Sequence, residues 1–243
     1  MYRFFCRSLN IFGDKFILDD KQKLHHLKDV LRLRPKDRVV IFDERGSEYN
    51  CIIEKISDKV ELHILSKQVF AKKQGFEITL ACAIPKKPKF DEIVDKLTQL
   101  GVDKIIPLLT KRVIVKWDKQ KQISKLKRWQ KLALSAAEQA QRSYLPILES
   151  PKDIKEVLAE SQGFDLKLIP TLTGSRKTIK EILSHTKPKN ILILIGPEGD
   201  FTAEEVRLAI KADCIPITLG ETVLRVDTAA VAVVSFIKLY AHN

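Results

Sequence analysis

The 243-residue chain lacks the sequence signatures of several common functional sites. No G-x-G-x-x-G follows an apolar run and no Walker lysine is present, which argues against dinucleotide and nucleoside triphosphate sites. No group of His and Cys has metal-ligand spacing, so we predict no metal site, and no Ser, His and Asp set indicates a nucleophile. A small-molecule site in this chain must therefore be formed by other motifs than these.

Cysteine is sparse and long apolar runs are missing. The four cysteines lie far apart, form no C-x-x-C pair and fall mostly inside apolar runs, which is typical of reduced, buried thiols in a cytosolic protein. No apolar run approaches the roughly 18 residues that a membrane span needs, and two arginines interrupt the N-terminal MYRFFCRSLN. We expect a cytoplasmic protein without a membrane partner. The cysteines are Cys6, Cys51, Cys82 and Cys214.

Positive charge is what the chain has in excess. Lys and Arg number 43 against 31 Asp and Glu, a formal net charge of +12, so an acidic polymer is the expected partner. A single charge run is more often a solvated face, but here the runs recur across both halves. They are Arg32, Arg34, Lys36 and Arg38; Lys72 and Lys73; Lys86, Lys87 and Lys89; Lys111, Arg112 and Lys116; and Lys119 through Lys131.

Residues 1–70 predict a small, mostly β domain of barrel type with one helix at Lys21–Leu31. Basic residues lie on this helix or just after it, where they could bind phosphate while staying solvated. For the histidines, a solvated surface position is the stronger interpretation. The basic patch is His26, Arg32, Arg34, Lys36 and Arg38, and the expected strands are Arg38–Asp43, Glu48–Ile56 and Lys59–Leu65.

After the polar stretch from Gln68 to Gly75, strands and helices alternate, which predicts a second domain at 75–243. The alternation favours an α/β fold, a parallel sheet with helices on both faces that binds ligands beyond the carboxyl ends of its strands. The expected strands are Phe76–Ile84, Ile105–Leu109, Asp165–Thr171, Ile191–Ile195 and Ile215–Leu219. The expected helices are Phe90–Leu100, Lys119–Arg142, Thr178–Ser184, one capped by Thr202, and one from Asp227 or Thr228 to Tyr240.

Two late stretches share one design, in which an apolar strand leads through a glycine-containing turn into a helix. The first turn reads GPEG at 196–199, and Thr202 and Glu205 then predict a capping box. A GPEG turn alone does not distinguish a rigid helix start from a ligand loop. With the turn at 172–174, however, these turns predict the small-molecule site. The final helix is apolar nearly all round, which predicts burial in the domain or against a partner.

The order of the motifs resembles a known family. GPEGDFTAEE followed by LGETVLRVDTAA, and preceded by KFDEIVDKLTQLGVDKIIPLLTKRVIV and RWQKLALSAAEQAQR, is similar to the 16S ribosomal RNA uridine N3-methyltransferases, the RsmE family of the SPOUT superfamily. HHLKDVLRLRPKDRVVIFD resembles that family's PUA-like RNA-binding domain. The resemblance covers nearly the whole chain. It implies a C-terminal trefoil knot, S-adenosylmethionine as methyl donor, a homodimer, and 16S rRNA or the assembled small ribosomal subunit as substrate.

The same resemblance implies the site residues. Arg225 would stabilise the developing N3 anion or hold RNA, and Asp227 would orient Arg225 or assist proton removal, although a helix-capping role is at least as compatible with its position. S-adenosylmethionine would be held by Leu172, Thr173, Gly174, Gly196, Glu198, Gly199, Leu219, Gly220, Leu224 and Thr228. RNA contacts are expected at His26, Arg32, Arg34, Lys111, Arg112 and Arg142.

The chain departs from the family pattern in a few places, which keeps two alternatives open. A different knotted RNA methyltransferase, acting on a ribose 2′-hydroxyl or on tRNA, is disfavoured by the PUA-like front and by LGETVLRVDTAA. A non-enzymatic RNA-binding or ribosome-assembly factor is motivated by Asp200 and Thr222. The departures are Asp200 for a usual glycine, Thr222 for arginine, Asp227 and Gln99 for glutamate, and AQR at 140–142 for SGR.

Overall fold

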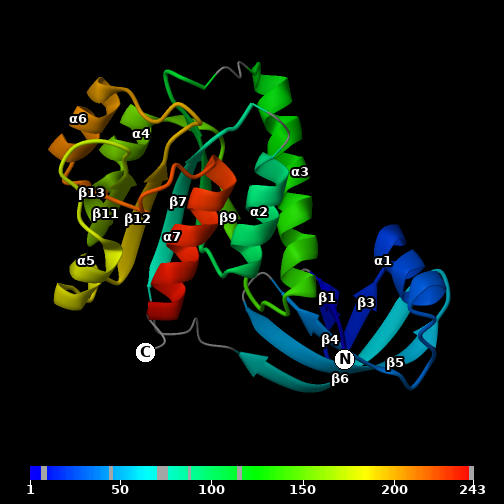
Figure 1. Cartoon of the computed structure of the whole chain (residues 1–243). Helices are drawn as coiled ribbons and strands as arrows, with labels where there is room; N and C mark the ends of the chain where they lie inside the picture. Colours follow the sequence, from blue (N-terminus) through cyan, green and yellow to red (C-terminus); the bar gives the residue numbers. More distant parts are fainter. Residues whose placement is uncertain (7–9, 44–45, 70–75, 87–88, 114–116, 241–243) are drawn as a thin grey trace. The chain divides into compact units, whose positions relative to one another are not determined.

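The computed structural model describes residues 1–6, 10–43, 46–69, 76–86, 89–113 and 117–240 (Figure 1). Most of the expected domain boundary, and Lys72, Lys73, Lys87 and Lys116, lie outside these residues. The chain divides into two compact units, one of Met1–Gln74 with Ala137–Leu145 and one of Gly75–Ala136 with Pro146–Asn243. No pattern in the sequence indicated that residues 137–145 join the N-terminal residues.

The first unit is built on a six-stranded sheet in the order β1-β4-β5-β6-β3-β2. Only β1 and β4 pair in parallel, and the β5–β6 pairing shifts register twice, which bends long strands. The predicted strands are confirmed, whereas the short β2 and β3 were missed. The strands are β1 (Tyr2–Phe5), β2 (Ile11–Phe12), β3 (Lys15–Leu18), β4 (Arg38–Phe42), β5 (Ser47–Ile56) and β6 (Val60–Val69).

The predicted N-terminal helix is present but changes its winding. It runs as α1 (Lys21–His25), capped by the Asp20 carboxylate, and continues as a π-helix at His26–Val30. Leu24 and Leu27 are buried against the sheet, so the helix covers the core of this unit. The extra residue in a π-turn shifts the following side chains around the axis, which periodicity alone does not reveal.

Residues 137–145 join the first unit through specific polar contacts. The Phe5 amide donates to the Glu138 carboxylate over 2.8 Å, and burial raises the pKa of Glu138 above its ordinary value. Glu48 pairs with Arg3 and accepts from the Ser143 hydroxyl. These bonds tie Glu138 to the end of β1 and Ser143 to Glu48 of β5.

The second unit contains a parallel sheet in the order β10-β8-β7-β12-β11-β13, with β9 also on β8. Every pairing between these strands is parallel, as the alternation of elements predicts. The central strands β7 and β12 are almost wholly buried. The strands are β7 (Glu77–Ala83), β8 (Lys104–Leu109), β9 (Ile147–Leu148), β10 (Lys152–Asp153), β11 (Leu166–Pro170), β12 (Asn190–Ile195) and β13 (Ile215–Ile217).

Helices cover both faces of this sheet, because successive strand residues point to opposite sides. One core packs β7, β11 and β12 against α2, α3, α5 and α7, and the other packs them against α4 and α6 (Figure 1). Helix α4 was missed, although its Asp153–Glu156 capping box was a readable signal. The helices are α2 (Phe90–Gln99), α3 (Lys119–Gln139), α4 (Ile154–Ala159), α5 (Ile179–His185), α6 (Ala203–Lys211) and α7 (Val226–Tyr240), with a 3₁₀ turn at Ser161–Gly163.

Helix α7 buries only one face within the chain, although its sequence is apolar nearly all round. The buried face packs against α2, β7 and β12. On the other side Phe236 is 40% exposed and Leu239 68%, and the Phe236 ring stacks on Tyr240. The expectation of burial is thus met for one face. None of the described helices is long and apolar enough to cross a membrane.

Candidate functional site

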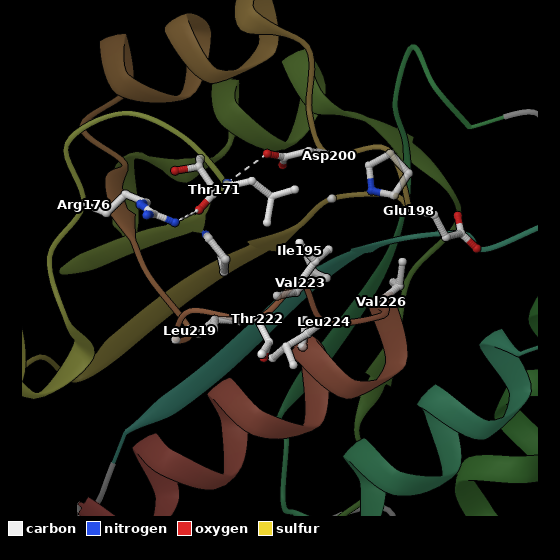
Figure 2. A pocket seen from close by; sticks show the side chains of 16 residues that line it. Thr171, Arg176, Ile195, Glu198, Asp200, Leu219, Thr222, Val223, Leu224 and Val226 are labelled. Carbon is white, nitrogen blue, oxygen red and sulfur yellow. Dashed lines mark hydrogen bonds between the residues drawn. The ribbon is translucent and has the colours of Figure 1, made fainter.

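A pocket of about 580 Å³, its open mouth included, lies beyond the carboxyl ends of β11 and β12 (Figure 2). The turns after β11, β12 and β13 form its walls, and the start of α7 closes it. This is the edge at which parallel sheets bind ligands. The lining residues are Pro170, Thr171, Leu172, Arg176, Ile195, Gly196, Pro197, Glu198, Asp200, Leu219, Gly220, Thr222, Val223, Leu224, Val226 and Ala229.

Gly196 makes the turn after β12 possible. A Cβ there would lie 3.0 Å from the Phe201 ring and 3.3 Å from the Phe201 amide nitrogen. Phe201 is 4% exposed in the core beneath the turn and has little room to move. The chain then enters α6 through the predicted capping box, in which Thr202 and Glu205 bond reciprocally. The turn is therefore held tightly from below while its upper surface faces the pocket.

Asp200 links this turn to the turn after β11. Its backbone has φ +62°, a left-handed conformation that glycine adopts more readily. One carboxylate oxygen accepts from the Leu172 amide over 3.0 Å, and the other accepts from the Phe201 amide over 2.8 Å. The dashed line to Asp200 in Figure 2 marks the first of these bonds. Asp200 thereby connects two walls of the pocket.

The third wall combines apolar side chains with a glycine turn. Gly220 has φ +117°, and its amide donates to the Thr218 hydroxyl over 3.2 Å. Beside it, Leu219 and Leu224 line the pocket, and Val223 is 71% exposed at its edge. Apolar side chains that line a pocket in this way suit a carbon-rich ligand.

The predicted cofactor residues divide into two groups. Leu172, Gly196, Glu198, Leu219, Gly220 and Leu224 line the pocket. Thr173, Gly174, Gly199 and Thr228 lie beside these in sequence but do not line it. Arg176 lines the pocket and was not predicted; its guanidinium donates to the Thr171 carbonyl over 3.1 Å. No motif marked Arg176, because its place depends on how the loop after β11 folds back.

Arg225 and Asp227 lie in a neighbouring cavity of about 660 Å³, its open side included. Helix α7 begins at Val226, so Asp227 sits inside the first turn and is not the N-cap residue. Glu198 and Val226 line both cavities, which makes the two contiguous. The second cavity is lined by Pro85, Lys86, Lys89, Glu198, Arg225, Val226 and Asp227.

Lys111 and Arg112, predicted to contact RNA, are engaged by the protein itself. The Lys111 ammonium pairs with Glu204, and its amide donates to Glu205 over 2.8 Å. The Arg112 guanidinium donates to the carbonyl of Gly199 and, over 3.3 Å, to that of Asp200. Both residues therefore brace the start of α6 and the turn after β12.

The other predicted RNA residues lie in the first unit. His26, Arg32 and Arg34 are exposed, and Arg142 is half-buried. Arg32 has φ +53°, and Leu31 and Leu33 on either side of it pack against the core. The loop is thus anchored by its leucines and presents its arginines outward. Within the described residues, no group of three or more His, Cys, Asp or Glu could hold a metal ion.

Comparisons with known proteins point in one direction. A family model described as an RNA methyltransferase domain matches residues 72–238, and one described as an RNA methyltransferase PUA domain matches residues 18–65. A protein of Mesomycoplasma hyopneumoniae named ribosomal RNA small subunit methyltransferase E is 31% identical over 95% of this chain and 96% of its own. The protein of that name from Bacillus subtilis is 29% identical, over 89% and 87%.

A solved structure leads to the same group of proteins. The ribosomal RNA small subunit methyltransferase E of Neisseria gonorrhoeae, bound to S-adenosylmethionine, matches 99% of this chain and 98% of its own with a TM-score of 0.88 and 27% identity. A methyltransferase of Legionella pneumophila, also in complex with S-adenosylmethionine, matches 98% and 97% with a TM-score of 0.87 and 29% identity.

Proposed function

Because the chain belongs to the ribosomal RNA small subunit methyltransferase E family, we propose that it methylates N3 of one uridine in 16S rRNA with S-adenosylmethionine as methyl donor. In this proposal residues 1–70 bind RNA and residues 75–243 carry out methyl transfer. The enzyme would work in the cytoplasm, on naked 16S rRNA or on the assembled small subunit.

The observation that carries the proposal is the fit of the first pocket to S-adenosylmethionine. A Cβ at Gly196 would press on Phe201, so glycine lets the turn that lines the pocket pack closely on the core. Leu219 and Leu224 offer apolar surface to an adenine ring. The cofactor supplies an electrophilic methyl group, and the residues around it contribute position and charge.

Methyl transfer to uracil N3 requires alignment of the nucleophile and loss of the N3 proton, and it requires no metal. Arg225 lies in the contiguous second cavity, where its positive charge would stabilise the N3 anion. Asp227, in the first turn of α7 and lining the same cavity, would orient Arg225 or assist proton removal.

The direct test is transfer of labelled methyl groups to assembled small subunits and to naked 16S rRNA, followed by location of the modified nucleotide. We expect one N3-methyluridine. Transfer to neither substrate, or modification of a ribose, would refute the proposal.

Binding of RNA by the first unit gives a separate prediction. Replacing Arg32 and Arg34 by alanine should weaken 16S rRNA binding and lower the slope of log affinity against log salt by about two, because two phosphate contacts are lost. Affinity for S-adenosylmethionine should not change. The matched control replaces Lys55 and Lys59, exposed at the β5–β6 end of the same unit. Equal weakening in both double variants would contradict a localised patch.

We also propose a homodimer that covers the exposed face of α7, and a C-terminal knot. For the dimer, the support is the apolar face that α7 leaves exposed around Phe236 and Leu239. For the knot, the support is that the chain leaves the edge strand β13 and returns to pack α7 against the central strands β7 and β12.

The dimer can be tested with a single charge. Leu239→Asp should convert dimer to monomer in sedimentation equilibrium, since an unpaired charge in an apolar interface is costly. Ile210→Asp is the matched control, because Ile210 is 48% exposed on α6 and lies outside the proposed interface. A wild-type monomer, or a dimer that survives Leu239→Asp, would contradict this interface.

A further inference from the structure

The second cavity brings together charged side chains from three separate segments of the chain. Lys86, Lys89 and Arg225 supply positive charge, and Glu198 and Asp227 supply negative charge. Other charged residues near the turns are engaged, for example Lys111 by Glu204 and Asp200 by the Leu172 amide. Among the described residues, none of the five charged side chains of the second cavity forms a side-chain hydrogen bond or an ion pair. These cationic and carboxylate side chains suit a ligand that carries both an anionic group and hydrogen-bond donors.

Glu198 and Asp227 come from separate elements but approach the same point. Cys82, fully buried near the end of β7, has a raised pKa mainly because of burial, and the Asp227 and Glu198 carboxylates raise it further. Both carboxylates are therefore close enough to the end of β7 for their charge to be felt there. The cavity thus has two acidic groups near the end of β7 and three basic groups along its lining.

Glu198 differs from Asp227 because it also lines the first pocket. In Figure 2 its carboxylate points away from Ile195, Leu219 and Thr222, that is, out of the first pocket. It is also exposed, so it can exchange a proton with solvent. A group at this junction would lie beside both a methyl donor bound in the first pocket and a base bound in the second cavity.

We propose that the second cavity receives the target uridine nucleotide, with Lys86 and Lys89 on its phosphate and Glu198 as the acceptor of the N3 proton. This inference rests on the proposed function and assigns the proton acceptor to Glu198 in place of Asp227. The N3–H bond breaks and its proton passes to a Glu198 oxygen. The N3 electron pair forms the bond to the methyl carbon, and the electrons of the carbon–sulfur bond stay on sulfur. S-adenosylhomocysteine leaves, and Glu198 returns the proton to solvent.

Nucleotide binding tests the cavity without any turnover. Uridine 5′-monophosphate is titrated into the full chain and followed by NMR. Replacing Lys86 and Lys89 by alanine should weaken its binding about tenfold and reduce the dependence on salt. Replacing Lys119 and Lys121, exposed at the start of α3, removes the same charge and should leave binding unchanged. Equal effects of the two double variants would overturn the assignment of the cavity.

The proton acceptor is tested with Glu198→Gln and Asp227→Asn in single-turnover methyl transfer to small subunits across a pH series. Glu198→Gln should slow transfer about a hundredfold at neutral pH, within the range that general bases contribute. The loss should shrink as pH rises, and also on RNA containing 5-fluorouridine, whose N3–H is more acidic. The Glu198→Gln variant should keep the cooperative thermal transition of the wild type, which shows that it is folded.

Two results would overturn this role. One is a Glu198→Gln loss that neither pH nor 5-fluorouridine relieves, and the other is such relief in Asp227→Asn alone. Failure of the proposed function is separate, because the wild type would then form no N3-methyluridine at all.

Discussion

Gly196→Val should weaken binding of S-adenosylmethionine by up to about a hundredfold while leaving a folded protein. A Cβ at this position would already lie 3.0 Å from the Phe201 ring, and valine adds two further carbons, so the turn that lines the pocket must shift. Forced overpacking of this kind costs about 1–3 kcal/mol, which corresponds to an affinity loss of up to about a hundredfold. Isothermal titration measures the affinity, and Gly196→Ala should give an intermediate loss.

The control is Gly163→Val, in the 3₁₀ turn after α4. Gly163 is exposed, and a Cβ there would meet nothing within 4 Å. It should therefore bind S-adenosylmethionine as the wild type does. If both valine variants bind the cofactor normally, the turn after β12 is not a wall of the cofactor site. If Gly196→Val loses its cooperative thermal transition, the affinity for S-adenosylmethionine is compared between Gly196→Ala and the wild type.

The core of the second unit could be predicted from sequence because its signals are local. Apolar β-branched runs such as Ile191–Ile195 become buried strands, and the Thr202–Glu205 capping box starts α6 where expected. The strand order could not be predicted. It depends on which strands lie side by side, for example β7 next to β12, which are far apart in the chain.

Sequence could predict those residues of the candidate site that lie in recognisable turns. Leu172 and Leu219 belong to turns that the sequence marks, whereas Arg176 lines the pocket only because its loop folds back. Lys111 has a long-range contact that the sequence could not predict. Its charge predicts an RNA contact, and its ion pair with Glu204, a residue far along the chain, became apparent only in the folded chain.

Asp200 is where the sequence departed from the family pattern, and the structure assigns it a positioning role. The usual glycine would adopt φ +62° without strain but would carry no carboxylate to join Leu172 to Phe201. Aspartate accepts the left-handed backbone better than most residues, and its charge strengthens both hydrogen bonds. Asp200 therefore adopts this backbone conformation less readily than glycine would, but it adds hydrogen bonds that link two walls of the pocket.

Replacing Asp200 should consequently weaken cofactor binding, even by the family's own residue. Asp200→Gly loses two bonds to a charged acceptor, each contributing about 1.5–3 kcal/mol, part of which the relaxed turn offsets, so we expect S-adenosylmethionine affinity to fall about tenfold. Asp200→Asn keeps one carbonyl acceptor and should fall in between. Asp200→Ala loses the bonds and keeps the left-handed strain, which costs about 1–2 kcal/mol, so its thermal midpoint should fall furthest. Isothermal titration and thermal unfolding separate the two effects. An Asp200→Gly variant that binds as tightly as the wild type would show that the link does not hold the pocket in its binding form.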